Sequence, residues 1–205
     1  SHAVAKGVIP PSHAVHICYC HTPMRYAWAM EEEYLDAFGV PSTLRPFAKR
    51  MLKSLRRWDL STAKRVDIFL ANSSETQDRI CRIYGRESFV VSPPVQDRFF
   101  AFPIRALAER TFALAVGRLV PYKRFDLLIA LANARKLPLK IVGTGREHTR
   151  LQSMAGPTVE LLGYVPDDKL PELYASARVL LFPQHEDAGI VPLEAMASGT
   201  PVVAY

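Results

Sequence analysis

Short apolar runs alternate with helix-like segments throughout the second half of the chain. Runs of strand length occupy residues 112–116, 139–142, 159–162, 179–182 and 201–204. Between them, apolar residues recur at helical spacing over 124–134, 147–154, 168–177 and 191–197. A strand followed by a helix, repeated along the chain, predicts a parallel sheet with helices on both faces. The second half should therefore be a doubly wound α/β domain.

The first half shows similar signals in a less regular order. Strands are predicted at residues 14–19, 67–71 and 89–91. Ser74 and Gln77 form a capping-box pattern that opens a helix, and Gly85 should end it. Between residues 95 and 110 no period is visible and proline-containing turns occur. This stretch is interpreted as a connection between two domains, residues 1–94 and 111–205.

The composition is that of a folded protein, with 49% apolar and 22% charged residues. No apolar run approaches the roughly 18 residues that a membrane span requires. The three cysteines are an odd number, and Cys18 and Cys20 are too close along a strand for an ordinary disulfide, so a reduced, cytoplasmic setting is expected. The net charge of +6 favours negatively charged partners, which include phosphates, nucleic acid and anionic bilayers.

A basic amphipathic helix is predicted between Leu44 and Trp58. Apolar residues recur there at helical spacing, and residues 45–65 contain eight bases and one acid, Asp59. Such a helix could lie on an anionic membrane surface or bind an acidic acceptor. An equally good interpretation is that its apolar stripe packs on its own domain while its bases are solvated.

Two carboxylates, Glu186 and Glu194, flank a glycine at the end of the fourth strand of the second half. An apolar strand that ends in a loop with Gly189 and then starts a helix presents free N–H groups to an anion. Glu186 would lie in the loop and Glu194 about one turn into the helix, so they could bind opposite ends of an extended ligand. Alternatively, Glu194 only complements the helix dipole and Glu186 is a solvated loop acid.

Glycine follows three of the predicted strands, at Gly117, Gly143 and Gly163. All three turns should lie at one edge of the sheet, where a glycine permits close approach to a ligand. Arg118 and Lys123 lie in the first loop and could converge on a diphosphate. Neither a dinucleotide fingerprint nor a phosphate-binding loop motif is present. Together with the two carboxylates, these loops predict a pocket for a phosphate-bearing, hydroxyl-rich molecule.

Three other residues, at two places in the chain, carry side chains that could take part in chemistry. His21 follows the first predicted strand, a good place for chemistry, although a structural histidine bonded to nearby backbone is slightly favoured. Asp167 and Asp168 are adjacent and lack the Asp-x-Asp metal pattern, so they are interpreted as a helix cap.

These motifs together resemble the retaining glycosyltransferases of family 4, the group 1 glycosyltransferases of the GT-B fold. The resemblance rests on GRLVPYK at 117–123, IVGTG at 141–145, LGYV at 162–165 and the Glu186-x7-Glu194 element. The first half is similar through residues 19–26, 71–74 and 92–95. The resemblance is nearest to mannosyltransferases that build surface polysaccharides on lipid carriers.

The resemblance implies two Rossmann-like domains and a role for each motif. Arg118 and Lys123 would hold the donor pyrophosphate and neutralise charge on the departing nucleotide. Glu186 would bind hydroxyls of the donor sugar and Glu194 those of the ribose. His21, from the acceptor-side domain, would approach the sugar. The remaining implied donor-binding residues are Gly117, Gly143, Tyr164, Val165, Gly189, Ile190 and Val191.

The resemblance also implies the reaction. A sugar, expected to be mannose from GDP-mannose, would pass to a lipid-linked or glycan acceptor with retention of configuration and without a metal or other cofactor. The expected place is the cytoplasm or the inner face of the plasma membrane. Nucleic acid is not an expected partner, because the basic helix lacks interleaved aromatic residues and a reading motif.

The part of the family that the resemblance covers affects the expected activity of this chain. The resemblance covers only the later part of the family's amino-terminal domain and stops before the end of its carboxyl-terminal domain. Both domains are therefore expected to be truncated, and the chain alone is expected to be an inactive fragment. A noncatalytic nucleotide-sugar-binding module is the alternative from another functional class.

Overall fold

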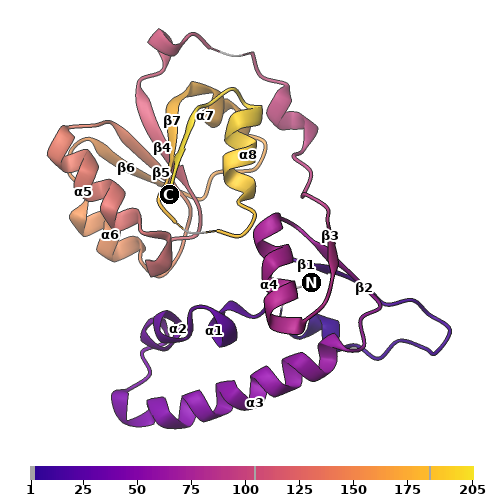
Figure 1. Ribbon diagram of the computed structural model, residues 1–205. Coiled ribbons are helices and arrows are strands. Elements are labelled where there is room, and N and C mark those ends of the chain that lie inside the picture. The colour runs from indigo at the N-terminus through magenta and orange to yellow at the C-terminus, as the bar shows by residue number, and fades with distance from the viewer. Residues whose placement is uncertain (1–2, 104, 185) are drawn as a thin grey trace. The chain divides into compact units, whose positions relative to one another are not determined.

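The computed structural model describes residues 3–103, 105–184 and 186–205, and the chain divides into two compact units, residues 1–93 and 94–205. Each unit has its own parallel sheet (Figure 1). The α/β class with two parallel sheets is confirmed. Within the described ranges, no helix is both long enough and apolar enough to cross a bilayer.

The second unit contains a five-stranded parallel sheet in the order β6-β5-β4-β7-β8. Its strands are β4 (Phe112–Val116), β5 (Leu139–Val142), β6 (Val159–Gly163), β7 (Ala177–Phe182) and β8 (Val202–Ala204). Its helices are α5 (Phe125–Arg135), α6 (His148–Met154), α7 (Leu170–Ser176) and α8 (Ile190–Ala197), with short 3₁₀ turns at Asp97–Phe100, Leu107–Glu109 and Pro121–Lys123. The predicted alternation of strand and helix is confirmed.

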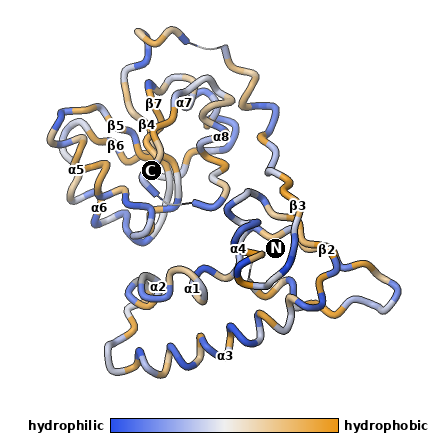
Figure 2. The backbone as a smooth tube through the Cα atoms, viewed as in Figure 1, coloured by the Kyte–Doolittle hydropathy of each residue, from blue (hydrophilic) through white to orange (hydrophobic). Residues whose placement is uncertain are grey.

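Both faces of this sheet are covered by apolar side chains. Ala113 and Ala115 of β4 join the core under α5 and α6, whereas Leu114 between them joins the core under α7 and α8. Strands buried on two faces are continuously apolar, which is why they stand out in the sequence and in the hydropathy colouring of Figure 2.

The strand order reverses beside β4. From β4 the chain proceeds outward through β5 and β6, then returns to β7 on the other side of β4 and continues to β8. The loops that follow β4 and β7 therefore leave toward opposite faces of the sheet. In open parallel sheets such a switch point is where ligands bind, at the carboxyl ends of the strands.

The first unit contains a three-stranded parallel sheet in the order β1-β2-β3. The strands are β1 (Ile17–Cys20), β2 (Ile68–Ala71) and β3 (Ser88–Val90). The helices are α1 (Arg25–Trp28), α2 (Glu31–Ala37), α3 (Arg45–Ala63) and α4 (Ser74–Tyr84), with 3₁₀ turns at Ala3–Gly7 and Ser42–Leu44. β1 begins at Ile17, later than predicted, and its register with β2 starts where Ile17 lies opposite Ile68.

Helix α4 is capped by the residue before the predicted one. The hydroxyl of Ser73, not of Ser74, accepts the N–H of Thr76 at 3.1 Å. Gly85 ends the helix in the left-handed conformation, as predicted, and its N–H donates to Cys81. The two adjacent serines make the sequence pattern compatible with either cap.

Ser73→Ala is expected to lower the free energy of unfolding by about 1 kcal/mol, because one helix N–H loses its acceptor. Ser61→Ala is the matched control, since Ser61 lies exposed near the end of α3 and bonds only its own helix. Urea unfolding followed by circular dichroism measures both variants. Equal stability of the Ser73 and Ser61 variants would contradict the assignment of the cap.

Residues 95–110, expected to connect two domains, pack on the second unit. Phe99 is buried against the ring of Tyr174, with ring centres 5.9 Å apart, and its carbonyl accepts the Ser198 hydroxyl at 3.2 Å. Arg110 is buried and donates to the carbonyl of Gly199 at 2.7 Å. These contacts fix the entry into β4.

A buried ion pair ties the start of the chain to α3. Lys6 and Asp59 are both buried and bonded to each other. The other carboxylate oxygen of Asp59 accepts hydrogen bonds from the Trp28 indole at 2.8 Å and the Tyr84 hydroxyl at 2.9 Å. A buried charge is tolerated when it is paired and bonded in this way. Asp59, the only acid between residues 45 and 65, therefore points inward.

Candidate functional site

The three glycine loops lie side by side at one edge of the second sheet, as predicted. The N–H of Gly117 donates to Val142 at 2.9 Å, and that of Gly143 donates to Gly163 at 2.7 Å. The N–H of Leu119 donates to the carbonyl of Thr144 at 2.9 Å. These bonds continue the sheet pairing beyond the strand ends and hold the loops in fixed register.

Gly143 is required by the contact between two loops. A β-carbon at this position would lie 1.9 Å from the carbonyl oxygen of Gly117, and the backbone has φ of 138°. Gly163 is different, because a β-carbon there would meet open space although φ is 68°. The glycine at 143 thus lets the loop after β5 lie directly against the loop after β4.

Lys123 and Glu186 meet across the switch point of the sheet. Lys123 ends the 3₁₀ turn after β4, Glu186 lies in the loop after β7, and the ammonium donates to a carboxylate oxygen of Glu186. Their side chains are only 14% and 21% exposed. The strand order brings these two residues together, because β4 and β7 are neighbours in the sheet.

Besides Glu186, two aromatic rings lie near the ammonium of Lys123. Its ammonium nitrogen lies 5.9 Å from the ring centre of Phe182 and 5.7 Å from that of Tyr122. A partly desolvated ammonium carries three donors, and its attraction to an added negative charge is stronger than in water. A phosphate that reached this point would compete with Glu186 for the same cation.

Glu194 lies in the second turn of α8 and is held by α7. The Tyr174 hydroxyl donates to its carboxylate at 3.1 Å. Burial raises the pKa of the Glu194 carboxyl, while the hydrogen bond from Tyr174 and the charge of Arg98 act in the opposite direction. The same burial, together with the Glu194 charge, raises the pKa of Tyr174, which keeps its hydroxyl a donor. Glu194 is thus a half-buried, oriented acceptor.

The amino end of α8 follows directly from the Glu186 loop. Gly189 precedes Ile190, the first residue of the helix, and Val191 packs into the core under α7 and α8. The N–H groups of this first turn have no partner within the helix and form the positive end of its dipole.

The other predicted site residues have varied surroundings. Arg118 and Tyr164 are exposed, and Val165 is partly buried against the core under α7 and α8. His21 belongs to the first unit, where it directly follows β1. Its ring packs edge-on against Tyr19, with centres 5.3 Å apart, and its carbonyl accepts the Thr76 hydroxyl at 3.1 Å.

Two residues at this edge were not singled out by the sequence. Tyr174, which orients Glu194, sits at a buried helix position, where a tyrosine requires a partner for its hydroxyl. Gln184 is 2% exposed and lies two residues beyond Phe182, the apolar end of β7. Its amide nitrogen has no acceptor among the residues that the structure describes. The sequence signal that could have identified Gln184 is a polar residue just beyond a buried strand.

The interpretation of Asp167 and Asp168 as a helix cap is wrong. Helix α7 begins at Leu170, its preceding residue is Lys169, and no side chain caps it. Asp167 instead accepts a hydrogen bond from Arg98 at 3.4 Å. The turn before α7 therefore places these acids too far from the first helical N–H groups.

The chain is similar to a known protein family and to individual proteins of bacteria. Residues 97–205 match the family model of glycosyl transferases group 1. The GDP-mannose-dependent alpha-mannosyltransferase of Mycobacterium tuberculosis is 44% identical over 90 residues, which are 43% of this chain and 24% of that protein. Mannosylfructose-phosphate synthase of Agrobacterium fabrum is 28% identical and covers 94% of this chain and 49% of its own.

Proteins of known structure share this fold. Sucrose-phosphate synthase from Thermosynechococcus elongatus matches 93% of this chain and 49% of its own, with a TM-score of 0.64 and 20% identity. The Anabaena protein HepE in complex with UDP-glucose matches 74% of this chain and 48% of its own, with a TM-score of 0.63 and 24% identity. These likenesses confirm the GT-B type of fold.

The chain spans between about a quarter and a half of the length of these relatives. The family model covers more than half of the chain and includes the whole edge that carries Lys123, Glu186 and Glu194. The resemblance drawn from the sequence motifs is thereby confirmed. This chain belongs to the group 1 glycosyl transferases.

Proposed function

We propose that this chain is part of a retaining glycosyltransferase that moves mannose from GDP-mannose to a lipid-linked or glycan acceptor. The Lys123–Glu186 pair at the switch point carries the proposal, because it offers a cation to a diphosphate and a carboxylate to sugar hydroxyls in one place. The names of the two mannose-handling relatives support the choice of donor. We assign donor binding to the unit of residues 94–205.

The donor would be held by groups at the carboxyl edge of the second sheet. Its pyrophosphate would take the ammonium of Lys123 away from Glu186, with the exposed Arg118 as a second cation. The N–H groups of Gly189 and Ile190 would bind the same phosphates at the positive end of α8. Glu186, released from Lys123, would then accept hydrogen bonds from the sugar.

In the proposed reaction, the bond between the anomeric carbon and the phosphate oxygen breaks, and the acceptor oxygen bonds to that carbon on the same face. The departing phosphate takes the proton of the acceptor hydroxyl. Lys123 and the α8 amino end would stabilise the negative charge that develops on the phosphate, and such electrostatic stabilisation is usually the largest contribution to catalysis. The reaction as proposed needs no metal, and the contribution of His21 stays a prediction.

A donor screen tests the proposal. Ligand binding raises the melting temperature of a folded protein, so GDP-mannose, UDP-glucose, UDP-GlcNAc, GDP and UDP are compared by thermal shift and then by calorimetry. We expect GDP-mannose to give the largest shift and GDP a smaller one. The absence of binding by every nucleotide at millimolar concentration would refute the proposal, and a preference for a UDP-sugar would refute the donor.

Glu194→Gln is expected to stabilise the free chain while weakening GDP binding about tenfold, because glutamine keeps a group for Tyr174 but lacks the charge that binds ribose hydroxyls. Burial raises the pKa of Glu194 in the folded chain above its value of about 4 in the unfolded chain. The folded wild-type chain therefore becomes less stable as the pH rises from about 4 through the raised pKa, because the buried carboxyl must then ionise. The variant lacks this loss. Its advantage in melting temperature should therefore be absent near pH 4 and present at pH 7.

Thermal unfolding between pH 4 and 7 and calorimetry with GDP measure the two effects. Glu160→Gln is a suitable control, because Glu160 is exposed on β6 and forms its ion pair with Lys140 there. A glutamine variant at 194 that is less stable at every pH would contradict the argument.

A further inference from the structure

The exposed side of α3, together with the residue that precedes the helix, carries a stripe of apolar residues. Leu44, Phe47 and Met51 are 56%, 66% and 60% exposed. Their spacing of three and four residues places them on one face of the helix. Burial of the helix within its own unit accounts for Leu52 and Leu55, which are half-buried, but not for these three side chains.

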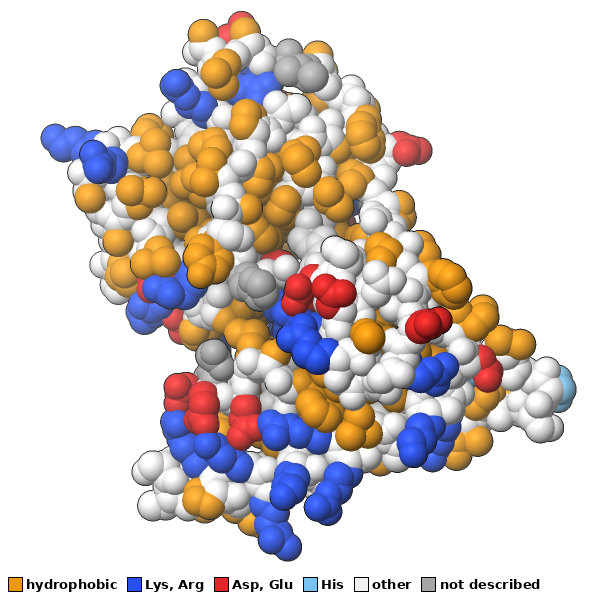
Figure 3. Space-filling view, in the orientation of Figure 1, with side chains coloured by type: hydrophobic (Ala, Val, Ile, Leu, Met, Phe, Trp, Pro, Cys, Tyr) orange, Lys and Arg blue, Asp and Glu red, His pale blue; other side chains and the backbone are white. Residues whose placement is uncertain are grey.

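A stripe of bases runs beside the apolar stripe. Arg50, Lys53 and Arg57 are exposed, and they are also spaced by three and four residues. Within the parts of the chain that the structure describes, no ion pair involves any of them. In Figure 2 the colour of α3 alternates between hydrophilic and hydrophobic, and in Figure 3 Lys and Arg side chains gather along this helix.

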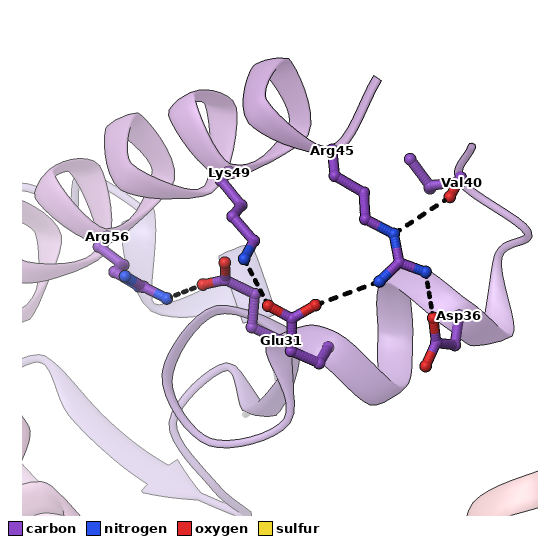
Figure 4. A network of polar contacts seen from close by, with 7 residues as sticks. Glu31, Asp36, Val40, Arg45, Lys49 and Arg56 are labelled. Carbon is purple, nitrogen blue, oxygen red and sulfur yellow. Dashed lines mark hydrogen bonds and ion pairs between the residues drawn. The ribbon is translucent and has the colours of Figure 1, made fainter. Parts of the chain in front are cut away.

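The remaining bases of α3 are bound to α2. Arg56 pairs with Glu31, Lys49 pairs with Glu32 at 2.5 Å, and Arg45 pairs with Asp36 and with Glu32 (Figure 4). Arg45 also donates to the backbone carbonyl of Val40, which follows α2, and Arg56 donates to that of Ala27 in α1. The acids of α2 therefore neutralise one side of α3 and leave the other side cationic.

No acid offsets the cationic side from within α3. Asp59 is bonded to Lys6 in the interior. Trp58, although partly exposed, packs on the first 3₁₀ turn, since its indole lies close to Gly7 and under the Lys6 ammonium. The outer face thus presents three bases, for which the described residues provide no ion pair, beside three exposed apolar side chains.

We propose that this face of α3 binds the surface of an anionic bilayer. Arg50, Lys53 and Arg57 would contact lipid phosphates, and the three apolar side chains would enter the boundary between headgroups and acyl chains. The paired stripes favour a bilayer over nucleic acid, because a phosphate backbone needs the bases but has no use for parallel apolar residues. All of these residues lie in the first unit, so the proposal is independent of the donor site.

Vesicle sedimentation tests the proposal with the 205-residue chain. Vesicles of phosphatidylcholine alone are compared with vesicles of equal parts phosphatidylcholine and phosphatidylglycerol. We expect strong binding to the mixed vesicles, weak binding to the neutral ones, and loss of binding at high salt. Because each base near an anionic surface strengthens binding several-fold, the triple variant Arg50→Gln, Lys53→Gln, Arg57→Gln should bind about 100-fold more weakly.

The matched control removes three exposed bases elsewhere: Arg82→Gln, Arg135→Gln, Lys169→Gln. It lowers the net charge equally, so a loss that depends on net charge alone would appear in both triple variants and would overturn the proposal. Melting temperatures equal to that of the wild type ensure that a loss of binding is not a loss of folding.

The apolar stripe is tested separately with the double variant Phe47→Ser, Met51→Ser, which keeps every base. We expect binding to the mixed vesicles to fall about tenfold. Phe100→Ser with Leu107→Ser, two exposed apolar residues of the second unit, is the control and should bind normally. If the Phe47 and Met51 variant binds mixed vesicles like the wild type, or if duplex DNA binds more tightly than the mixed vesicles, the proposal is wrong.

Discussion

Lys123→Met is expected to weaken GDP binding to this chain about 50-fold. The substitution keeps most of the side-chain volume beside Phe182 and Tyr122 but removes the ammonium that would bind the pyrophosphate. A hydrogen bond to a charged group is worth about 2 to 3 kcal/mol, which corresponds to this loss. Calorimetry with GDP measures it. Lys136→Met, at an exposed lysine after α5, should bind GDP normally.

Glu186→Gln should have the opposite effect on GDP. In the free chain Glu186 forms an ion pair with Lys123. A diphosphate must therefore displace the carboxylate from the ammonium, and it must also come close to the negative charge of that carboxylate. Glutamine is neutral and binds the ammonium more weakly, so it lowers both costs, and GDP should bind several-fold more tightly. The additional affinity that the sugar gives GDP-mannose over GDP should fall, because the neutral amide binds hydroxyls more weakly. Weaker GDP binding by this variant would show that Glu186 supports the diphosphate rather than competing with it.

Gly143→Ala is expected to lower the free energy of unfolding by about 4 kcal/mol, enough to unfold a marginally stable domain. The new methyl group would overlap the Gly117 carbonyl, which is backbone and cannot rotate away, and φ of 138° is also strained for alanine. Relief requires that the loop after β4 move, and this loop contains Lys123. Urea unfolding and GDP calorimetry should therefore both report a loss.

Gly163→Ala separates the two causes. This glycine has a positive φ but open space where a β-carbon would be built. Only the conformational strain applies, so the expected loss is about 1 kcal/mol. Comparable losses at positions 143 and 163 would mean that the clash with Gly117 is relieved at no cost.

The second sheet was predictable because parallel strands covered on both faces are continuous apolar runs. Each apolar run in the second half ends in a loop. The sequence therefore predicted the succession of strands along the chain and the position of the glycine loops at one edge of the sheet. The first unit was harder to predict. One face of its short strands carries the core, through Cys18, Cys20 and Phe69, so fewer residues mark each strand.

The residue types of the candidate site were also predictable, but their pairings were not. Lys123 and Glu186 were each expected to bind a different part of a ligand, yet they bind each other in the free chain. Their contact depends on the neighbouring of β4 and β7, which the local pattern does not encode. The Tyr174 bond to Glu194 likewise depends on how α7 packs beside α8. That Arg118, Lys123, Glu186 and Glu194 bind one common ligand stays a prediction.

For α3, the sequence left two interpretations open, and burial confirms only that one apolar stripe packs on its own unit, while membrane binding by the exposed stripe stays a proposal. Leu52, Leu55 and Ala63 pack inward, as expected for an ordinary amphipathic helix. The second apolar stripe could not be separated from the first by period alone, because both recur at helical spacing. The acids that pair with some of the bases of α3, and not with the others that the structure describes, lie on α2, which was not among the predicted helices.

The strand order of the second sheet has a consequence for synthesis of the chain on the ribosome. Among the strands of this sheet, β4 is synthesised first, and its neighbour β5 follows soon afterwards. Its other neighbour, β7, is synthesised only after β6 and α7. Until then one edge of the most central strand stays open, and open edges of apolar strands invite pairing with other chains. Nascent polypeptides halted before residue 177 should therefore aggregate more readily than those released after residue 182.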